Sequence, residues 1–456
     1  MLEDTIIAIS TPPGFGGLGI VRISGGKALD VAGRIFEQKG RPKKPFPDRR
    51  PVFGVVHDPE HRKPLDEAFL TYFKAPRSYT KEDVVEISVH GSPAVLEAIM
   101  KIGARAGARP ARPGEFTLRA HLNGRLDILQ AQAVNDLIRS ASLAQARISS
   151  RQLAGSLSKR VFRVRARLIG LLSRIEAKLE FPEDNIRTGS VADLKALSSL
   201  IDEVRRLIAS YETGRALAEG VMLAIVGRTN VGKSTLFNAL LEEERAIVTP
   251  FPGTTRDYIR ENLVVDGIVF HLVDMAGLGP PIHPVEKTGI ARGQKIAGEA
   301  DGLLVVIDAS RRDGEEDRRI IRKYRGKRAI IVLNKSDLPR KITIRSIREI
   351  SGTSPVIEVS ALKKRNIDRL RARIRAHFVP VAGKEEEIIL HSGQKDALEA
   401  ILEALCRAQG FQAGRESEEI YAEEIRSALR LIGELTGEVR VEEVLGAIFG
   451  RFCVGK

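Results

Sequence analysis

The sequence contains 456 residues, of which 43% are hydrophobic and 29% charged, a composition typical of globular proteins with about three domains. The net charge of +14 favours an anionic partner such as nucleic acid, although a charge that serves only solubility gives the same value. Cys406 and Cys453 lie far apart in the sequence and suggest no disulfide framework. The start MLEDTIIAIS lacks the pattern of a secretory signal, and the sequence has no apolar run of about 18 residues that would predict a membrane span. We therefore expect a cytoplasmic protein that is not integral to a membrane.

Residues 1–118 predict an α+β domain. Short β-rich runs are separated by Gly/Pro turns, and two stretches near Lys27–Phe36 and Ala94–Gly107 have helical character. The runs are TIIAIS, GIVRIS, PVFGVV, AFLTYF and VVEISVH. Gly14, Gly16 and Gly19 match G-x-G-x-x-G, but a strand and not a helix follows them, so a turn between strands is expected here and not a dinucleotide site.

The rest of the chain divides into a helical part that is interrupted by an α/β part. Residues 119–216 are helical, and in the run from Ser158 to Glu180 leucines recur at helical spacing while arginines fall elsewhere, either as an RNA-binding face or as a solvated surface. Apolar strands alternate with helices over residues 217–380, which is typical of a parallel sheet covered on both faces. Residues 381–456 are helical again, so an α/β domain inserted in a helical domain is expected.

A phosphate-binding loop is predicted at Gly227–Ser234, which reads GRTNVGKS between the strand VMLAIV and the helix STLFNALL. Its glycines let backbone N–H groups surround the phosphates, Lys233 reaches the β- and γ-phosphates, and the Ser234 hydroxyl binds Mg²⁺. The residues assigned to nucleotide contact are Asn230, Val231, Gly232, Lys233, Ser234 and Thr235.

Four further motifs follow in the order that a Ras-like GTPase requires. Gly253-Thr254-Thr255 supplies a switch segment whose Thr255 hydroxyl binds Mg²⁺, and Asp274-Met275-Ala276-Gly277 holds the Mg²⁺ shell and senses the γ-phosphate. Asn334-Lys335-Ser336-Asp337 reads guanine, because the Asp337 carboxylate can accept hydrogen bonds from N1–H and the exocyclic amine, a donor pair that adenine lacks. Ser360-Ala361-Leu362 supports the base.

The residue that orients the hydrolytic water is not obvious from the motifs. In Ras-type enzymes a Gln follows Asp-x-x-Gly, whereas here Leu278 and Gly279 follow it. The nearest downstream carboxylate is Glu286, which could polarise water or could simply be a charge at a helix N-terminus.

The sequence resembles the MnmE (TrmE) family of tRNA-modification GTPases over essentially the whole chain. The resemblance rests on the motifs above and on the segments FPGTTRD, TPPGFGGLGIVRISG, RPGEFTLRAHLNGRLD and the terminal FCVGK. The resemblance implies a K⁺-dependent GTPase activated by dimerisation of its G domains, with Glu286 as the catalytic residue. It places one K⁺ ligand at Asn230 in the phosphate loop. The other K⁺ ligands would be Thr249, Phe251 and Thr254 in the switch loop, which also includes Pro250 and Pro252. Met275 departs from the family's usual Thr, which matters little because Asp274 and Gly277 make the contacts.

The resemblance also implies that the N-terminal domain dimerises and binds 5-formyl-tetrahydrofolate. By position the contacts would be Arg22, Glu86, Arg125 and Lys456, with Arg125 replacing a Lys of some members. Cys453 would lie near this site, either as a buried small side chain or as a reactive one.

The function that the resemblance implies is GTP hydrolysis coupled to an aminomethyl-type modification of carbon 5 of the wobble uridine of tRNA, by a homodimer working with the FAD-containing MnmG. Two alternatives are a ribosome-assembly GTPase, for which the C-terminal segment lacks a G-x-x-G motif, and a folate-dependent one-carbon transferase with a purely regulatory G domain.

Overall fold

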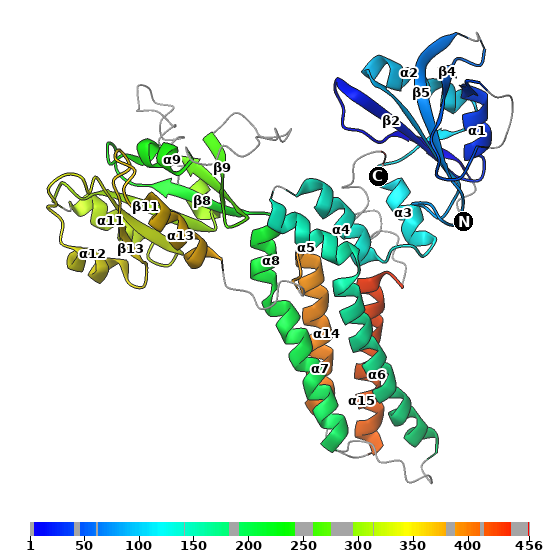
Figure 1. Ribbon diagram of the computed structural model, residues 1–456. Coiled ribbons are helices and arrows are strands. Elements are labelled where there is room, and N and C mark those ends of the chain that lie inside the picture. Colours follow the sequence, from blue (N-terminus) through cyan, green and yellow to red (C-terminus); the bar gives the residue numbers. More distant parts are fainter. Residues whose placement is uncertain are drawn as a thin grey trace. The chain divides into compact units, whose positions relative to one another are not determined.

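The computed structural model describes residues 4–40, 46–60, 63–140, 142–181, 191–241, 259–274, 295–312, 314–379, 388–410, 415–438 and 455. The chain forms two compact units (Figure 1). Unit 1 comprises Met1–Asn135, Gln152–Thr188 and Phe411–Lys456, and unit 2 comprises Asp136–Arg151 and Gly189–Gly410. No helix in the described ranges is both long and apolar enough to cross a bilayer.

Unit 1 contains a mixed sheet of seven described strands in the order β3-β4-β5-β6-β2-β1-β7. All neighbours are antiparallel except β1 and β7. The strands are β1 (Ile6–Ile9), β2 (Gly16–Ser24), β3 (Phe36–Gln38), β4 (Val52–His57), β5 (Pro64–Phe73), β6 (Val84–Gly91) and β7 (Arg109–Pro110). Side chains alternate along β5, where Leu70 is buried and Phe69 is exposed, as expected for a sheet with one face on a core.

Helices α1 (Ala28–Ile35) and α2 (Pro93–Arg105) supply apolar side chains to that core, so the predicted α+β fold is confirmed. Two short strands, β3 and β7, were not predicted. Phe36, expected at the end of a helix, begins β3 instead, because it pairs with Val56 and its ring packs in the core. The glycine-rich run leads directly into strand β2, which agrees with the turn expected there.

Helix α3 (Glu115–Leu122) is tied to the sheet by a buried ion cluster. The Arg119 side chain is only 1% exposed and forms ion pairs with Asp4, Glu82 and Glu115. Burial alone would raise the pKa of the Glu115 carboxyl, but hydrogen bonds from Arg109, the Arg112 amide and Arg119 hold it below its usual value. The cluster therefore fixes α3 through paired opposite charges, with Arg119 Nε left without a hydrogen-bond partner among the described residues.

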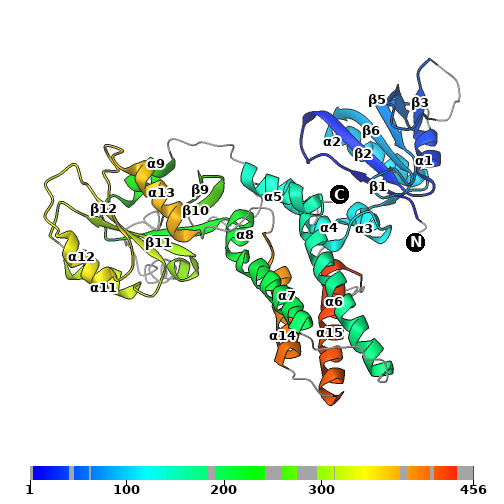
Figure 2. The same cartoon turned by 60° about the horizontal axis from the view of Figure 1, so that its bottom comes forward.

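The helical part of the chain contributes to both units. In unit 1, α6 (Ser156–Glu180) runs alongside α15 (Arg415–Thr436), and Glu176 and Arg426 form an ion pair between them at 3.0 Å (Figure 2). In unit 2, α7 (Val191–Ala209) runs alongside α14 (Ser392–Gly410). The remaining helices are α4 (Ile128–Arg139), α5 (Leu143–Leu153) and α8 (Tyr211–Ala218).

The helical periodicity predicted between Ser158 and Glu180 is confirmed in α6. Leu168, Leu171 and Ile175 are buried, whereas Arg163 and Arg174 are exposed. The arginines therefore lie off the packed stripe, which leaves both an RNA-binding face and a solvated surface compatible with the helix.

Unit 2 contains a Ras-like sheet of six described strands in the order β13-β12-β11-β8-β10-β9, all parallel except β9 against β10. The strands are β8 (Val221–Val226), β9 (Ile259–Val265), β10 (Ile268–Asp274), β11 (Gly302–Asp308), β12 (Ala329–Asn334) and β13 (Val356–Glu358). The helices are α9 (Lys233–Leu241), α11 (Glu315–Lys323), α12 (Ile344–Ser351) and α13 (Ile367–Phe378). β11 and β12 are buried throughout, as predicted for parallel strands covered on both faces.

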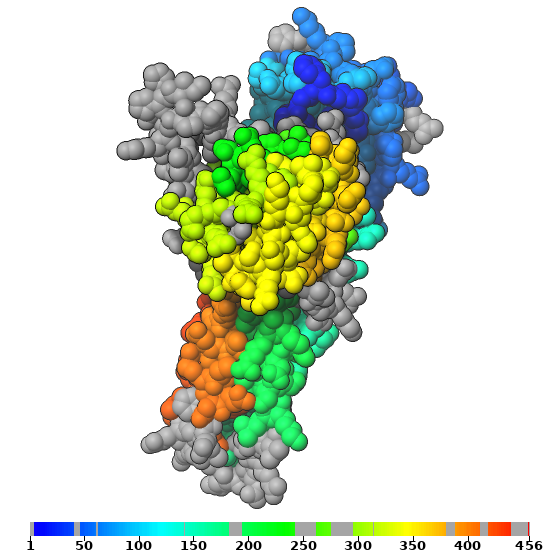
Figure 3. Space-filling view, turned by 90° about the vertical axis from the view of Figure 1, so that its left-hand side faces the viewer, coloured from blue at the N-terminus to red at the C-terminus, as the bar shows by residue number. Residues whose placement is uncertain are grey.

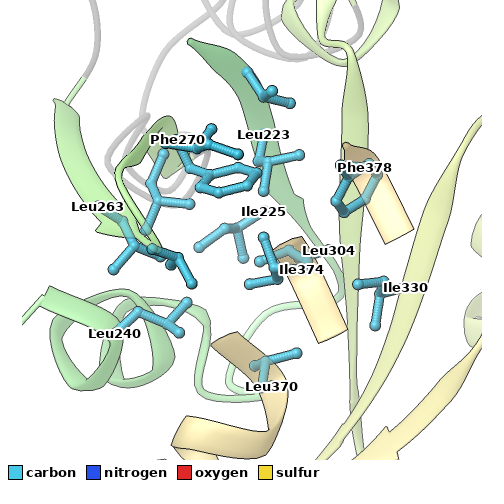
Figure 4. Packing of buried hydrophobic residues seen from close by; sticks show 14 of the residues in the cluster. Leu223, Ile225, Leu240, Leu263, Phe270, Leu304, Ile330, Leu370, Ile374 and Phe378 are labelled. Carbon is cyan, nitrogen blue, oxygen red and sulfur yellow. The ribbon is translucent and has the colours of Figure 1, made fainter. Parts of the chain in front are cut away.

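The core on one face of this sheet joins strands β8, β10, β11 and β12 to helices α9 and α13 (Figure 4). Phe270 and Ile225 meet Leu240 of α9 and Ile374 of α13. A second cluster on the other face includes Ile321 of α11 and Ile347 of α12. Figure 3 looks toward this part of the chain, in which the yellow segment that includes α12 forms much of the visible surface.

Strand β9 was not predicted, although the sequence carries a signal for it. Asp266-Gly267 separates LVV from IVFHLV, and such a dipeptide between apolar runs is a strong indication of a hairpin. Both residues have positive φ, 49° and 78°, and Val265 pairs with Ile268 across the turn. The strand is therefore the antiparallel edge of the Ras-like sheet.

Candidate functional site

The phosphate loop connects β8 to α9, as predicted. Burial of β8 brings Gly227 to the carboxyl edge of the sheet, where α9 begins at Lys233. The Lys233 ammonium donates hydrogen bonds to the carbonyl oxygens of Gly227 at 3.0 Å and Arg228 at 2.6 Å. Burial lowers the pKa of Lys233, and the Asp274 carboxylate opposes that shift. The ammonium group therefore lies against the loop that would surround the phosphates, hydrogen-bonded to two of its carbonyl oxygens.

Ser234 and Asp274 meet at the same edge. β10 is parallel to β8 with Asp274 opposite Ile225, so Asp274 ends its strand next to the loop. The Ser234 hydroxyl donates to the Asp274 carboxylate at 2.9 Å, and Asp274 is only 3% exposed. A hydroxyl and a carboxylate oxygen held together fit Mg²⁺, a hard cation that takes few protein ligands and shares substrate phosphates. The described ranges hold no cluster of three or more His, Cys, Asp or Glu side chains that could hold a metal ion.

Asn334 joins the phosphate loop to the base-supporting loop. Its side chain is 2% exposed, donates to the Val231 carbonyl at 3.0 Å and accepts from the Ala361 amide at 3.0 Å. Gly232 has φ 91°, and a Cβ there would lie 2.4 Å from Asn334 Nδ2. Only glycine therefore permits both the left-handed turn of the loop and this contact.

Lys335 of the guanine motif contacts both the phosphate loop and strand β11. Its ammonium donates to the Asn230 carbonyl at 2.9 Å and to Asp308 Oδ2 at 2.6 Å. Burial alone would raise the pKa of Asp308, but hydrogen bonds from Lys335 and Ser310 hold it below its usual value. Lys335 consequently supports the phosphate loop from the guanine motif.

Asp337 is held by the base-supporting loop. The Ser360 hydroxyl, which is fully buried, donates to Asp337 Oδ1 at 2.5 Å and accepts from the Lys363 amide at 3.1 Å. The hydrogen bond from Ser360 lowers the pKa of the Asp337 carboxyl, which keeps it ionised and able to accept hydrogen bonds. Leu362, by contrast, is 72% exposed and makes no part of this network.

Two residues of this site were missed in the sequence. Asp308 ends the buried strand β11 and binds Lys335, and a carboxylate at the carboxyl end of a parallel strand could have indicated it. Arg228, inside the phosphate loop, forms ion pairs with Glu316 at 2.8 Å and Asp317 at 3.4 Å in the first turn of α11. No local pattern indicates that second contact, because the acidic partners are far away in the sequence.

Many predicted site residues lie outside the described ranges. They are the switch residues Thr249, Pro250, Phe251, Pro252, Gly253, Thr254 and Thr255, then Met275, Ala276, Gly277 and Glu286, and finally Cys453 and Lys456. Of the predicted K⁺ ligands only Asn230 is described; it has φ 62°, and its carbonyl accepts from Lys335.

The predicted folate residues of unit 1 gather around Tyr79. Arg22 donates from Nε at 2.8 Å and Nη2 at 2.6 Å to Glu86 Oε1, across neighbouring strands β2 and β6. The Arg22 guanidinium lies 5.8 Å from the centre of the Tyr79 ring, and the Arg125 guanidinium lies 4.7 Å from it. Arg22, Glu86 and Arg125 are therefore brought together, although they are far apart in sequence.

Gly455 lies at the same site. Its carbonyl accepts from Ser10 Oγ at 3.3 Å and from Arg22 Nη1 at 3.4 Å. With φ 96°, a Cβ on Gly455 would lie 2.2 Å from the Ile9 carbonyl, so this close approach requires glycine. Gly455 thus contacts Arg22 of the Arg22–Glu86 pair within unit 1.

Two family models match most of the chain. The family description MnmE helical domain matches residues 128–453, and the description GTP-binding protein TrmE N-terminus matches residues 5–125. The chain belongs to the MnmE family. Relatives named tRNA modification GTPase MnmE match over 100% of both chains, at 39% identity in Thermoanaerobacter pseudethanolicus and 41% in Aquifex aeolicus. With the nucleotide site described above, this MnmE-family chain is a GTP hydrolase.

One solved structure, Aquifex aeolicus Era bound to GDP and aluminium fluoride, aligns with 40% of this chain and 66% of its own. The identity is 27% and the TM-score is 0.29.

Proposed function

We propose that this GTPase couples K⁺-dependent GTP hydrolysis to an aminomethyl- or carboxymethylaminomethyl-type modification of carbon 5 of the wobble uridine of tRNA. The relatives that match along the whole chain are named for tRNA modification, and the net charge of +14 suits an RNA substrate. The observation that carries the GTPase part is the joined site in which Asn334 links the phosphate loop to the loop that holds Asp337. Because of that link, the loop proposed to bind the phosphates and the loop proposed to support the base are held together.

At the phosphate end, Lys233 binds the β- and γ-phosphates and Ser234 with Asp274 holds Mg²⁺, as does Thr255 of the switch segment. When bound, Mg²⁺ neutralises charge on the phosphate oxygens. At the base end, Asp337 accepts hydrogen bonds from guanine while Ser360 fixes the carboxylate. Hydrolysis changes the conformation of the protein and gives no atoms to the tRNA.

The water-orienting group is proposed to be Glu286, since no Gln follows Gly277. K⁺, held at Asn230, Thr249, Phe251 and Thr254, would supply positive charge near the phosphates, where other GTPases use an arginine finger. Two G domains in a homodimer would complete this arrangement.

The N-terminal site is proposed to bind 5-formyl-tetrahydrofolate as the one-carbon donor. Arg22, Glu86 and Arg125 offer charged groups near the Tyr79 ring, and Gly455, which precedes Lys456 in the sequence, accepts a hydrogen bond from Arg22. An aromatic ring flanked by cations suits a flat ligand with carboxylates. The FAD-containing MnmG would be the partner in a cytoplasmic complex.

The domains assigned to these roles are proposed as residues 1–118 for folate binding and dimerisation, 119–216 with 381–456 for the helical domain, and 217–380 for the G domain. The helical domain would carry the changes of the G domain to the folate site, because its two parts flank the G domain in sequence.

The experiment that tests this function is nucleoside analysis of tRNA from cells that lack the protein. We expect the modified wobble uridine to disappear from its tRNAs and to return with the wild-type gene. Unchanged tRNA nucleosides together with defective ribosomal subunits would favour a ribosome-assembly GTPase and contradict the proposal.

The K⁺ dependence makes a second prediction. GTP turnover measured in K⁺ and in Na⁺ at equal ionic strength should differ by about tenfold or more, because Na⁺ is too small for a shell built partly of backbone carbonyls. Nucleotide affinity should stay within about twofold, since Lys233 and Mg²⁺ provide the ground-state contacts. Equal turnover in the two salts would rule out the assignment of Asn230 as a K⁺ ligand.

A further inference from the structure

A basic pocket opens beside the proposed folate residues in unit 1. Its volume is about 480 Å³, within the range of small-molecule sites. Four cations line it together with two aromatic rings, namely Arg49, Arg77, Lys81, Arg125, Phe73 and Tyr79. Four positive charges around one cavity favour a ligand with several negative charges.

Three of these four cations donate hydrogen bonds to uncharged backbone carbonyl oxygens. Lys81 Nζ donates to the Gly124 carbonyl at 2.9 Å, Arg49 Nη2 to the Arg77 carbonyl at 2.5 Å, and Arg125 Nη1 to the Tyr79 carbonyl at 2.8 Å. Of the four, only Arg77 forms an ion pair with a described carboxylate, that of Asp48 at 3.1 Å. The carbonyls orient the side chains and leave their charge unneutralised.

The carboxylates nearest along the chain are already engaged. Glu82 is paired with Arg119, and Asp83 accepts hydrogen bonds from the Tyr72 hydroxyl at 2.8 Å and the Ala75 amide at 2.9 Å. Neither acid lines the pocket, whose lining holds four cations and no carboxylate, so its charge is positive.

The pocket is continuous with the residues proposed to hold folate. Arg125 and Tyr79 line it, and the Tyr79 ring that faces Arg125 at 4.7 Å also has Arg22 at 5.8 Å. A ligand that contacts Arg22 and Glu86 could therefore extend past Tyr79 toward Lys81, Arg77 and Arg49.

We propose that this pocket binds the γ-glutamyl tail of a polyglutamylated folate. The inference rests on the proposed folate function and names the form of the ligand. Each added γ-linked glutamate brings one carboxylate, so the tail is a short chain of evenly spaced negative charges that can meet successive cations. Guanidinium groups suit carboxylates, because their paired N–H donors match the two oxygens.

A nucleic acid strand fits these observations less well. Proteins bind strands along extended basic grooves, and the present feature is a single cavity of about 480 Å³ that begins at the folate residues. Binding of tRNA in this pocket is distinguished from folate binding by the experiment below.

The test compares binding of 5-formyl-tetrahydrofolate carrying one glutamate with the form carrying three, by calorimetry on the full-length protein. Exposed ion pairs are individually weak, so two added carboxylates should raise affinity about tenfold, equivalent to about 1.4 kcal/mol. The double variant Arg49→Gln with Lys81→Gln should reduce this preference to about twofold or less and leave monoglutamate affinity nearly unchanged. High salt should reduce the preference in the same direction.

A matched control removes two charges elsewhere in the same domain. Lys63→Gln with Lys101→Gln alters two exposed lysines that do not line the pocket. Lys63 precedes β5, and the lining residue Phe73 ends that strand about 30 Å away. This control should keep the full preference for the triglutamate, which separates a local effect from a change in net charge.

Equal affinity of the wild type for both forms would overturn the tail site while the folate function stands. Failure of both forms to bind would remove the folate function and this inference together. A pocket variant that keeps the triglutamate preference but loses affinity for a tRNA anticodon stem-loop would assign the pocket to RNA instead.

Discussion

Replacing Asp337 by Asn is expected to convert the protein from a GTP-selective to a xanthosine-triphosphate-selective enzyme. The carboxylate accepts hydrogen bonds from guanine N1–H and from the exocyclic amine. The Asn side chain would instead turn its own N–H group toward the exocyclic amine, so that two donors face each other. Xanthine carries a carbonyl in place of that amine, so the Asn amide can donate to it. A site built for hydrogen bonding rejects a mismatched partner strongly, and we expect GTP affinity to fall at least about a hundredfold.

The structure explains why the change should stay local. Ser360 can donate to the amide oxygen of Asn as it does to Asp337 Oδ1 at 2.5 Å, so the base-supporting loop keeps its hydrogen bond. Affinities for the two triphosphates should be measured by nucleotide titration. The control Asp368→Asn makes the same chemical change at a side chain that is 87% exposed in the same domain, and should bind GTP as the wild type does. GTP affinity that survives in Asp337→Asn would show that another group reads guanine.

Replacing Glu286 by Ala should greatly slow hydrolysis while GTP still binds. A positioned acid–base group contributes about 10²–10⁴-fold to a rate, so single-turnover GTP hydrolysis should fall by about that factor. The phosphate and base contacts lie on Lys233, Ser234 and Asp337, so affinity should change by less than about twofold. Under the proposed coupling, the modified wobble uridine should be lost as well.

The matched control is Glu299→Ala, which removes an exposed carboxylate downstream in the same domain; the Glu299 side chain is 60% exposed. It should keep both hydrolysis and tRNA modification. Loss of hydrolysis with normal modification in Glu286→Ala would contradict the coupling and favour a one-carbon transferase with a regulatory G domain. Unchanged hydrolysis would remove Glu286 from the mechanism.

The elements of the nucleotide site were predictable because their patterns are local. The apolar runs of β8, β10, β11 and β12 are buried strands. The phosphate loop follows β8, and the motifs that begin with Asp274 and Asn334 start at the last residues of β10 and β12. Parallel strands bring their carboxyl ends to one edge, so the sequence order of the motifs already predicted that Lys233, Asp274 and Asp337 would share a site. β9 was not predicted, although the Asp266-Gly267 turn that joins it to β10 is a local hairpin signal.

The sequence by itself determined the Ras-like sheet, the α+β domain and the types of residue that bind phosphate and guanine, because strand burial and turn chemistry depend on neighbours along the chain. Only the tertiary structure decided that Asn334 bridges Val231 and Ala361, that Arg228 reaches Asp317, and that Gly455 meets Arg22. It also decided that Arg49, Lys81 and Arg125 line one cavity around Tyr79. The physical reason is that these contacts join residues tens or hundreds of positions apart, whose meeting depends on how whole elements pack and not on any local pattern.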